Sequence, residues 1–168
     1  PTVEASERMI VFPDIEGGST LVSDLHMHSV FSDGHVWPRT RVEEALRDGL
    51  DAIAITEHLE WQPHLADIPH LDRNRAHAIA ETAAAGQDLM VIKGSEITRD
   101  WPVGHIKAIF ITDANPLLGV NSFADPADTR AVYQAASQFP AASVLETAND
   151  QGAFLFWNHP DWVSQRPN

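Results

Sequence analysis

The sequence predicts an α/β fold built on a mainly parallel sheet with helices on both faces. Short apolar runs of strand length alternate with longer segments in which apolar residues recur at helical spacing. Most of these runs are apolar throughout, which is typical of parallel strands that are covered on both sides. Histidine and acidic residues directly follow several of the runs, and this placement predicts a functional site at one edge of the sheet.

The first predicted strand, residues 21–28, is the most informative stretch. Successive side chains of a strand point to opposite faces, so Asp24, His26 and His28 are expected on one face. Leu25 and Met27 are expected together on the other face, toward an apolar layer. Two imidazoles that are two residues apart can bind one borderline metal ion. The strand is therefore predicted to end in a pair of metal ligands.

Helices and strands then alternate along the chain. The first helix is predicted to begin at Thr40, which forms a capping box with Glu43, and to stop at Gly49. A later helix is predicted to begin at Asp125, an N-cap followed by proline, and to be interrupted at Pro140. The other predicted elements are strands at 52–56, 89–92, 106–111 and 153–157 and helices at 76–84 and 144–152. The third and fourth strands are separated by a short link, so an antiparallel or irregular arrangement of this pair stays open.

The composition narrows the class of protein. The chain of 168 residues is long enough for one domain with its own core. Its 24 acidic and 11 basic residues give a net charge of −13, which argues against a nucleic-acid-binding surface. No apolar run approaches the roughly 18 residues of a membrane span. The absence of cysteine excludes thiolate ligands. Because the chain begins at Pro1 without a visible signal peptide, both a cytoplasmic and an exported location stay open, and the oligomeric state is not predicted.

Candidate metal ligands gather where the predicted strands end. His26 and His28 end the first strand, His58 the second, Glu96 the third and His159 the fifth, whereas His105 opens the fourth. Sites in parallel α/β proteins form at the carboxyl ends of the strands. Unrelated histidines would be scattered between faces and ends, so their joint placement predicts one metal centre.

The motifs around these residues resemble those of a known family. They are Asp24-Leu25-His26-Met27-His28-Ser29 with Ser32-Asp33-Gly34, then Thr56-Glu57-His58, Gly94-Ser95-Glu96, Gly104-His105 and Asn158-His159-Pro160. In this order they resemble the PHP family, named for polymerase and histidinol phosphatase domains. Longer strings at 33–38, 94–99 and 156–162 are similar to a bacterial phosphodiesterase branch, which includes enzymes acting on diesters left by organophosphate triester breakdown.

The resemblance implies a distorted (β/α)7 barrel with two or three divalent metal ions, zinc, manganese or iron, at its mouth. Carried over by motif, His26 and His28 would hold one ion, Glu96 would bridge it to a second held by His105 and His159, and Asp33 and His58 would hold a third. The implied activity is metal-dependent hydrolysis of phosphoesters, with small phosphodiesters as the preferred substrates, by a hydroxide that bridges two metal ions.

The chain departs from the family's pattern at its end. PHP domains usually continue through two more strands to a late Asp-x-His motif, which has no counterpart after His159. We therefore expect residues 1–168 to form a single domain of about five strands that is truncated at the C-terminus. Five strands cannot close a seven-stranded barrel, so another polypeptide or an absent part of the protein is expected to complete it.

Two further residues are candidates for binding substrate. Arg99 follows Glu96 closely, and we expect its guanidinium to contact a phosphate oxygen in catalysis, although a solvated loop arginine is the plainer alternative. His64 lies in the loop after the second strand and is expected to line the pocket. One arginine together with metal ions balances the single charge of a diester, which favours diesters over monoesters.

Two other functions stay open. Amidohydrolases also begin with His-x-His on the first strand, but they commonly use a carboxylated lysine as the bridge where this chain offers Glu96. A panel of phosphoesters, amides and lactones separates the two classes. The missing late motif also permits a non-catalytic, metal-binding remnant of a PHP domain.

Overall fold

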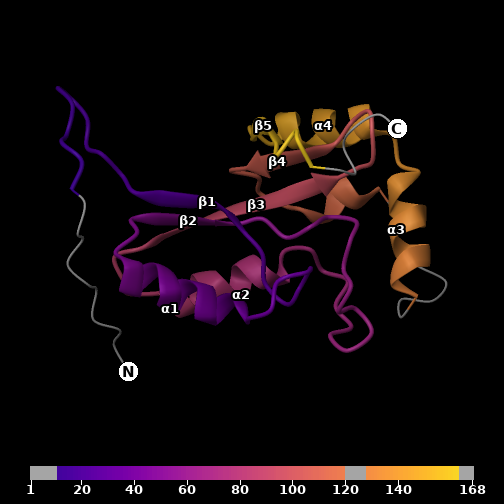
Figure 1. The fold of residues 1–168 in the computed structure, drawn as a ribbon, viewed down its shortest axis with the longest axis horizontal. Helices are drawn as coiled ribbons and strands as arrows, with labels where there is room; N and C mark the ends of the chain where they lie inside the picture. The colour runs from indigo at the N-terminus through magenta and orange to yellow at the C-terminus, as the bar shows by residue number, and fades with distance from the viewer. Residues whose placement is uncertain (1–10, 120–127, 163–168) are drawn as a thin grey trace.

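The computed structural model describes residues 11–119 and 128–162, which form one five-stranded sheet with helices packed on it (Figure 1). The sheet order follows the chain, β1-β2-β3-β4-β5. The strands are β1 (Ser23–Met27), β2 (Ala52–Ile55), β3 (Met90–Thr98), β4 (His105–Ile109) and β5 (Phe154–Asn158). The helices are α1 (Pro38–Asp48), α2 (Arg75–Ala84), α3 (Thr129–Ser137) and α4 (Ala141–Asp150), with a short 3-10 helix, η1 (Asn115–Leu118).

The strand directions bring five strand ends to one edge. The pairs β1-β2 and β2-β3 are parallel, whereas β3-β4 and β4-β5 are antiparallel. The expected parallel arrangement is therefore correct for β1, β2 and β3. The pair β3-β4, which a short link joins, is antiparallel, one of the two arrangements that the sequence left open. Because β5 runs in the same direction as β3, the carboxyl ends of β1, β2, β3 and β5 meet the amino end of β4 at one edge.

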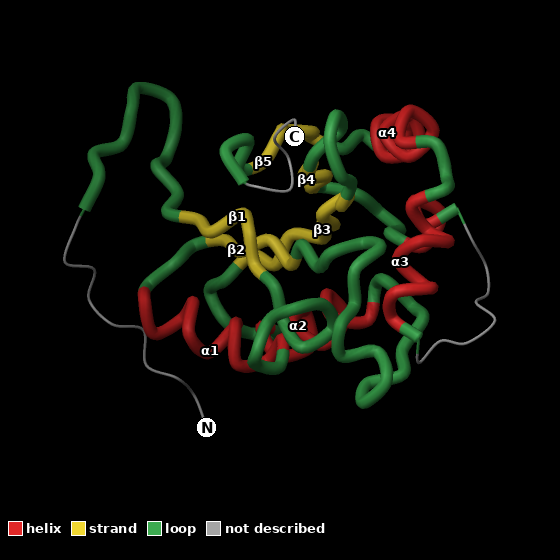
Figure 2. Tube along the Cα trace, turned by 45° about the vertical axis from the view of Figure 1, so that its right-hand side comes forward, coloured by secondary structure: helices red, strands yellow, loops and turns green. Residues whose placement is uncertain are grey.

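The sheet curls into a half-barrel, and Figure 2 shows the five strands following a curve in which β5 turns back toward β1. Helices α1 and α2 cover one face of β1 and β2, where Ile53 and Ile55 are buried against Val42 and Ala80. A second apolar cluster lies between β3, β4, η1 and the later helices. A small third cluster, with Ala54 and Ile92, comes from side chains of β2, β3 and β4 that belong to neither of the others.

A register irregularity in β1 corrects one expectation from the sequence. Met27 packs in the apolar cluster between the sheet and helices α1 and α2, whereas Leu25 packs against the third cluster. The two side chains therefore do not share a face of the sheet. The pairing of β1 with β2 shifts its register between Asp24 and Met27. An irregular residue in a strand interrupts the alternation of side chains between faces, which no period-two pattern reveals.

Local sequence signals predicted some of the helix boundaries correctly and others not. Helix α1 begins at Pro38 and not after Thr40, because proline already has the φ angle of a first helical position. Its stop at Gly49 is confirmed, with φ of 71°. The start expected at Asp125 lies outside the described residues. In the described part, α3 follows Asp128, whose carboxylate accepts a hydrogen bond from the Ala131 amide. The break at Pro140 is confirmed.

Within residues 11–119 and 128–162, no helix has the length and apolar character needed to cross a membrane. The five described strands agree with the number expected, and the closure of a seven-stranded barrel remains a prediction.

Candidate metal centre

The candidate ligands converge at the edge where the strand ends meet. His26 lies near the end of β1, and His28 follows that strand directly. His58 follows β2 and forms an isolated parallel bridge with Glu96 in β3. His105 opens β4, and His159 follows β5. The antiparallel direction of β4 is what brings its first residue to the ends of the other strands.

Glu96 is the centre of the cluster and is fully buried. Its Oε2 atom lies 2.9 Å from His28 Nε2 and 3.3 Å from His26 Nε2. Its Oε1 atom lies 2.9 Å from His105 Nδ1 and 3.1 Å from His159 Nε2. The two oxygens of one carboxylate thus face two separate pairs of imidazoles, which is the arrangement that a bridging carboxylate needs.

Two groups that sequence reasoning missed hold this carboxylate. The ammonium group of Lys107, also fully buried, lies 2.6 Å from Glu96 Oε2 and 3.0 Å from Thr56 Oγ1. The Asn158 side-chain amide donates to Glu96 Oε1 at 3.1 Å. Burial alone would raise the pKa of Glu96, but hydrogen bonds from its histidines and the Lys107 charge hold that pKa far below its usual range. The signal was present in the sequence, because His105 and Lys107 are two residues apart on one strand face.

A second group of ligands lies beside the first. Asp33 Oδ2 is 3.4 Å from His58 Nε2, and Asp33 Oδ1 is 3.6 Å from His28 Nδ1. The hydrogen bond from His58 lowers the pKa of Asp33 to about 2. Burial lowers the pKa of His28 to about 4, so this imidazole is neutral near pH 7 and its lone pair is available for a metal.

Buried polar contacts fix the orientation of these ligands. The buried Glu57 carboxylate accepts hydrogen bonds from the hydroxyls of Ser29 and Ser32, and it also accepts one from the Ser29 amide. These bonds fasten the loop that carries Asp33. The hydroxyl of Thr98 lies 2.6 Å from His58 Nδ1 and thereby orients that ring. Such contacts hold ligand atoms in place and tune their basicity.

The donor set fits divalent metal ions. Three overlapping groups each offer three ligand atoms that lie within 4.8 Å of one another: His26, His28 and Glu96; His28, Asp33 and His58; His58, Glu96 and His105. Mixed imidazole and carboxylate donors suit zinc, manganese and iron. His159 also faces Glu96, at the distance given above. The clusters of the described residues therefore fit divalent metal binding.

The cluster forms one side of a cavity of about 480 Å³. The remaining lining residues are Trp61, Thr98, Asp100, Tyr133 and Trp162. Trp61 follows β2, Tyr133 belongs to α3 and Trp162 follows β5, so segments far apart in the sequence build the wall. None of the described residues that line the cavity is lysine or arginine.

Two predicted substrate residues do not line this cavity. Arg99 is buried: its Nε lies 2.9 Å from Glu60 Oε1, and its Nη1 donates to the Ser137 carbonyl at 2.6 Å. This corrects the expectation that its guanidinium faces a phosphate group, because the buried Glu60 carboxylate attracts it inward. His64 is half-buried in the loop after β2 and is also absent from the lining.

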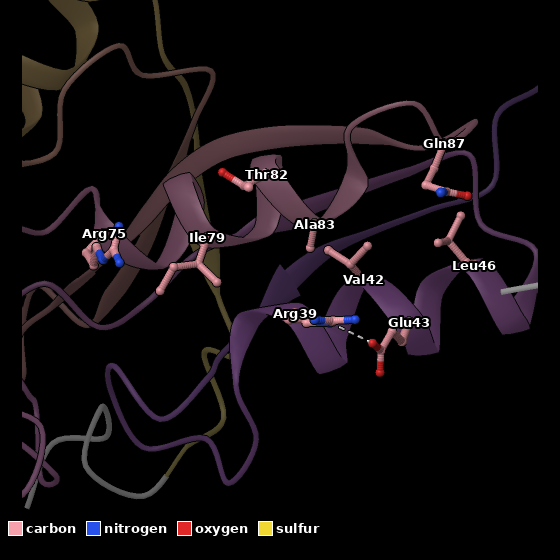
Figure 3. A pocket seen from close by; sticks show the side chains of 9 residues that line it. All are labelled: Arg39, Val42, Glu43, Leu46, Arg75, Ile79, Thr82, Ala83 and Gln87. Carbon is pink, nitrogen blue, oxygen red and sulfur yellow. Dashed lines mark hydrogen bonds and ion pairs between the residues drawn. The ribbon is translucent and has the colours of Figure 1, made fainter. Parts of the chain in front are cut away.

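A second cavity of similar volume lies between α1 and α2 (Figure 3). Its lining residues are Arg39, Val42, Glu43, Leu46, Arg75, Ile79, Thr82, Ala83 and Gln87. It contains no histidine, and its single carboxylate pairs with Arg39 at 2.9 Å. This cavity therefore lacks the donor set that marks the candidate metal centre.

Comparisons with known proteins agree with this geometry. Residues 24–102, which include His26, His28, Asp33, His58 and Glu96, match the family model of the PHP domain. A two-domain protein from Bacteroides vulgatus, containing a predicted PHP-like metal-dependent phosphoesterase, is 46% identical with a TM-score of 0.77. The match covers 98% of this chain and 42% of that chain, so this chain spans less than half the length of that protein.

Two other solved structures resemble shorter parts of the chain. One is a proposed metal-dependent phosphoesterase from Bifidobacterium adolescentis, with 30% identity, coverage of 59% of this chain and 31% of that chain, and a TM-score of 0.45. The other is an amidohydrolase from Chromobacterium violaceum, with 27% identity, coverage of 58% and 30%, and a TM-score of 0.45. No curated protein matches the sequence.

Proposed function

We propose that this chain carries the centre of a metal-dependent phosphoesterase that hydrolyses small phosphodiesters. The observation that carries the proposal is the buried Glu96 carboxylate, whose two oxygens face separate histidine pairs at the edge of a cavity. The match of residues 24–102 to the PHP domain supports the same reaction class.

The chain's residues divide into ligands and supports. The ligands are His26, His28, Asp33, His58, Glu96, His105 and His159, with Glu96 as the bridge. Divalent ions held there would neutralise the phosphate, lower the pKa of water and stabilise the leaving oxygen. Lys107 and Asn158 keep both Glu96 oxygens aimed at the histidines, while Glu57 fixes the loop of Asp33.

The charge of the cavity wall supports diesters over monoesters. A phosphomonoester carries up to two negative charges at neutral pH, and proteins usually balance them with arginine or lysine. Among the described lining residues there is no such group, and Asp100 adds a negative charge. A diester carries one negative charge, which bound metal ions alone can balance. Arg99 takes no part in this charge balance, because its guanidinium pairs with Glu60 away from the cavity.

The test uses full-length protein loaded with zinc, manganese or iron in turn. We expect bis-para-nitrophenyl phosphate to be hydrolysed with higher kcat/KM than para-nitrophenyl phosphate. Glu96→Ala should lose bound metal, measured by elemental analysis, together with activity, whereas Glu43→Ala in the half-exposed part of α1, which does not line the cavity of the metal centre, should retain both. Faster turnover of the monoester would refute the diester assignment, and full metal content in Glu96→Ala would refute the bridging role.

A further inference from the structure

Aromatic rings form much of the cavity wall beyond the metal ligands. Trp61 and Tyr133 meet edge to face, with ring centroids 6.0 Å apart. The ring centroids of Trp162 and His159 are 5.4 Å apart. All three line the cavity, and Trp162 is 60% exposed, so its ring face is available to a molecule that enters. Aromatic faces attract cations, because the ring quadrupole is negative above its plane.

The same wall carries a negative charge and no described positive one. Asp100 is exposed and lines the cavity beside Tyr133. Burial raises the pKa of the Tyr133 hydroxyl, and the charge of the neighbouring Asp100 carboxylate raises it further. The adjacent guanidinium of Arg99 turns inward to Glu60 and does not neutralise the wall. A second anionic group of a substrate would meet Asp100 without a compensating lysine or arginine among the described lining residues.

We propose that this wall, formed by Trp61, Asp100, Tyr133 and Trp162, binds an alkylammonium group, so that the substrates are phosphodiesters of amino alcohols such as choline. The proposal rests on the proposed function, since the metal centre would hold the phosphate while the wall holds the cation. Aromatic faces combined with a carboxylate are the groups that recognise quaternary ammonium ions. An uncharged ester group of the same shape would gain only the apolar contact.

A matched pair of chromogenic diesters isolates the charge. One is para-nitrophenyl phosphorylcholine, and the other carries a tert-butyl group in place of trimethylammonium, which keeps the shape and removes the charge. Hydrolysis of either adds the oxygen of water to phosphorus, breaks the bond from phosphorus to the aryl oxygen and releases para-nitrophenol. On metal-loaded full-length protein, we expect kcat/KM to be about tenfold or more higher for the choline ester.

Two substitutions in the wall should lower this ratio. Asp100→Asn removes the carboxylate, and Trp162→Leu removes an exposed ring, so the ratio of the two kcat/KM values should fall toward one. Asp88→Asn is the matched control, because it removes one exposed carboxylate at the opposite end of β3. The ratio should be unchanged in this control.

Binding is measured separately from turnover by titrating tryptophan fluorescence with phosphocholine and with its tert-butyl analogue. Tighter binding of phosphocholine, lost in Asp100→Asn, supports the ammonium site even if no diester is hydrolysed, an outcome in which only the proposed function fails. Equal binding of both compounds, or equal or faster turnover of the uncharged diester, overturns the ammonium site while leaving the phosphodiesterase assignment in place.

Discussion

At the scale of single residues, Lys107 is unusual because it is a lysine without solvent exposure. Its side chain is fully buried and contacts the equally buried Glu96, with Thr56 Oγ1 as a further acceptor. Burial lowers the pKa of Lys107 to about 8, although the Glu96 charge acts in the opposite direction. Without metal, this ammonium group provides the closest positive charge to the Glu96 carboxylate among the described residues.

Replacing Lys107 with methionine should therefore destabilise the metal-free protein by about 3–5 kcal/mol, because a buried carboxylate loses its cation. With metal bound, the ion supplies the positive charge and the loss should be smaller. Thermal unfolding with and without zinc measures both values.

The control for this substitution is Lys93→Met. Lys93 is half-buried, its ammonium group donates to the Thr112 carbonyl at 2.9 Å, and it makes no described contact with the metal ligands. An equal loss of stability in the presence and absence of zinc for Lys107→Met would contradict this account of the lysine.

At the scale of elements, the turn after β1 determines where Asp33 lies. Gly34 packs so closely on the preceding backbone that an added Cβ would lie 2.6 Å from the carbonyl carbon and oxygen of His28. Backbone atoms cannot move aside as the end of a flexible side chain can. The turn that presents Asp33 therefore depends on glycine at this position, although its φ is not in the left-handed region.

Gly34→Ala should shift this turn, lower stability by about 1–3 kcal/mol and weaken metal binding at Asp33 and His58. Thermal unfolding and metal titration measure the two effects. Gly18→Ala is the control, since its added Cβ would lie 3.4 Å from the nearest atom of Ile15, an ordinary contact. Unchanged metal affinity in Gly34→Ala would show that the turn adapts without moving Asp33.

The sequence predicted the elements better than it predicted side-chain directions. Strand ends depend on local apolar runs, so the placement of His28 and His159 beside Glu96 followed from the order of the elements. His105 joins them because β4 is antiparallel to β3, an arrangement that the sequence left open. The inward turn of Arg99 did not follow from the sequence, because its partners are distant along the chain. Glu60 becomes its neighbour when the segment after β2 lies beside the end of β3, and Ser137 when α3 packs. The register irregularity in β1 likewise depends on the pairing with β2, so the residues of β1 alone do not predict it.

At the scale of the whole molecule, a buried carboxylate makes stability depend on pH. Glu60 is fully buried, accepts the Thr98 amide at 2.7 Å and pairs with Arg99. Burial raises its pKa to about 7 from 4.5, although the Arg99 charge lowers it. Between these values the folded state holds a proton that the unfolded state has released. The contribution of Glu60 is therefore complete below pH 4.5 and is lost as pH rises through about 7.

The unfolding free energy of the original protein should decrease between pH 5 and pH 8. In Glu60→Gln this decrease should be smaller by up to about 3 kcal/mol, because glutamine does not titrate. Denaturant unfolding of the metal-free protein across this range measures the effect. The exposed Glu81→Gln on α2 should keep the pH profile of the original protein. Parallel profiles for Glu60→Gln and the original protein would show that Glu60 is ionised throughout.

The curl of the sheet brings its two edges, β1 and β5, within reach of one another through side chains. The rings of His26 and His159 stack 5.7 Å apart, and the Asn158 amide nitrogen lies 3.4 Å from His26 Nδ1, across 132 positions of sequence. An ion bound between these edges would cross-link the first strand to the last and stabilise the folded state, as a covalent cross-link that closes a long loop does. Removing such an ion with a chelator should therefore lower the stability of the half-barrel, because β1 and β5 would lose the ion that joins them.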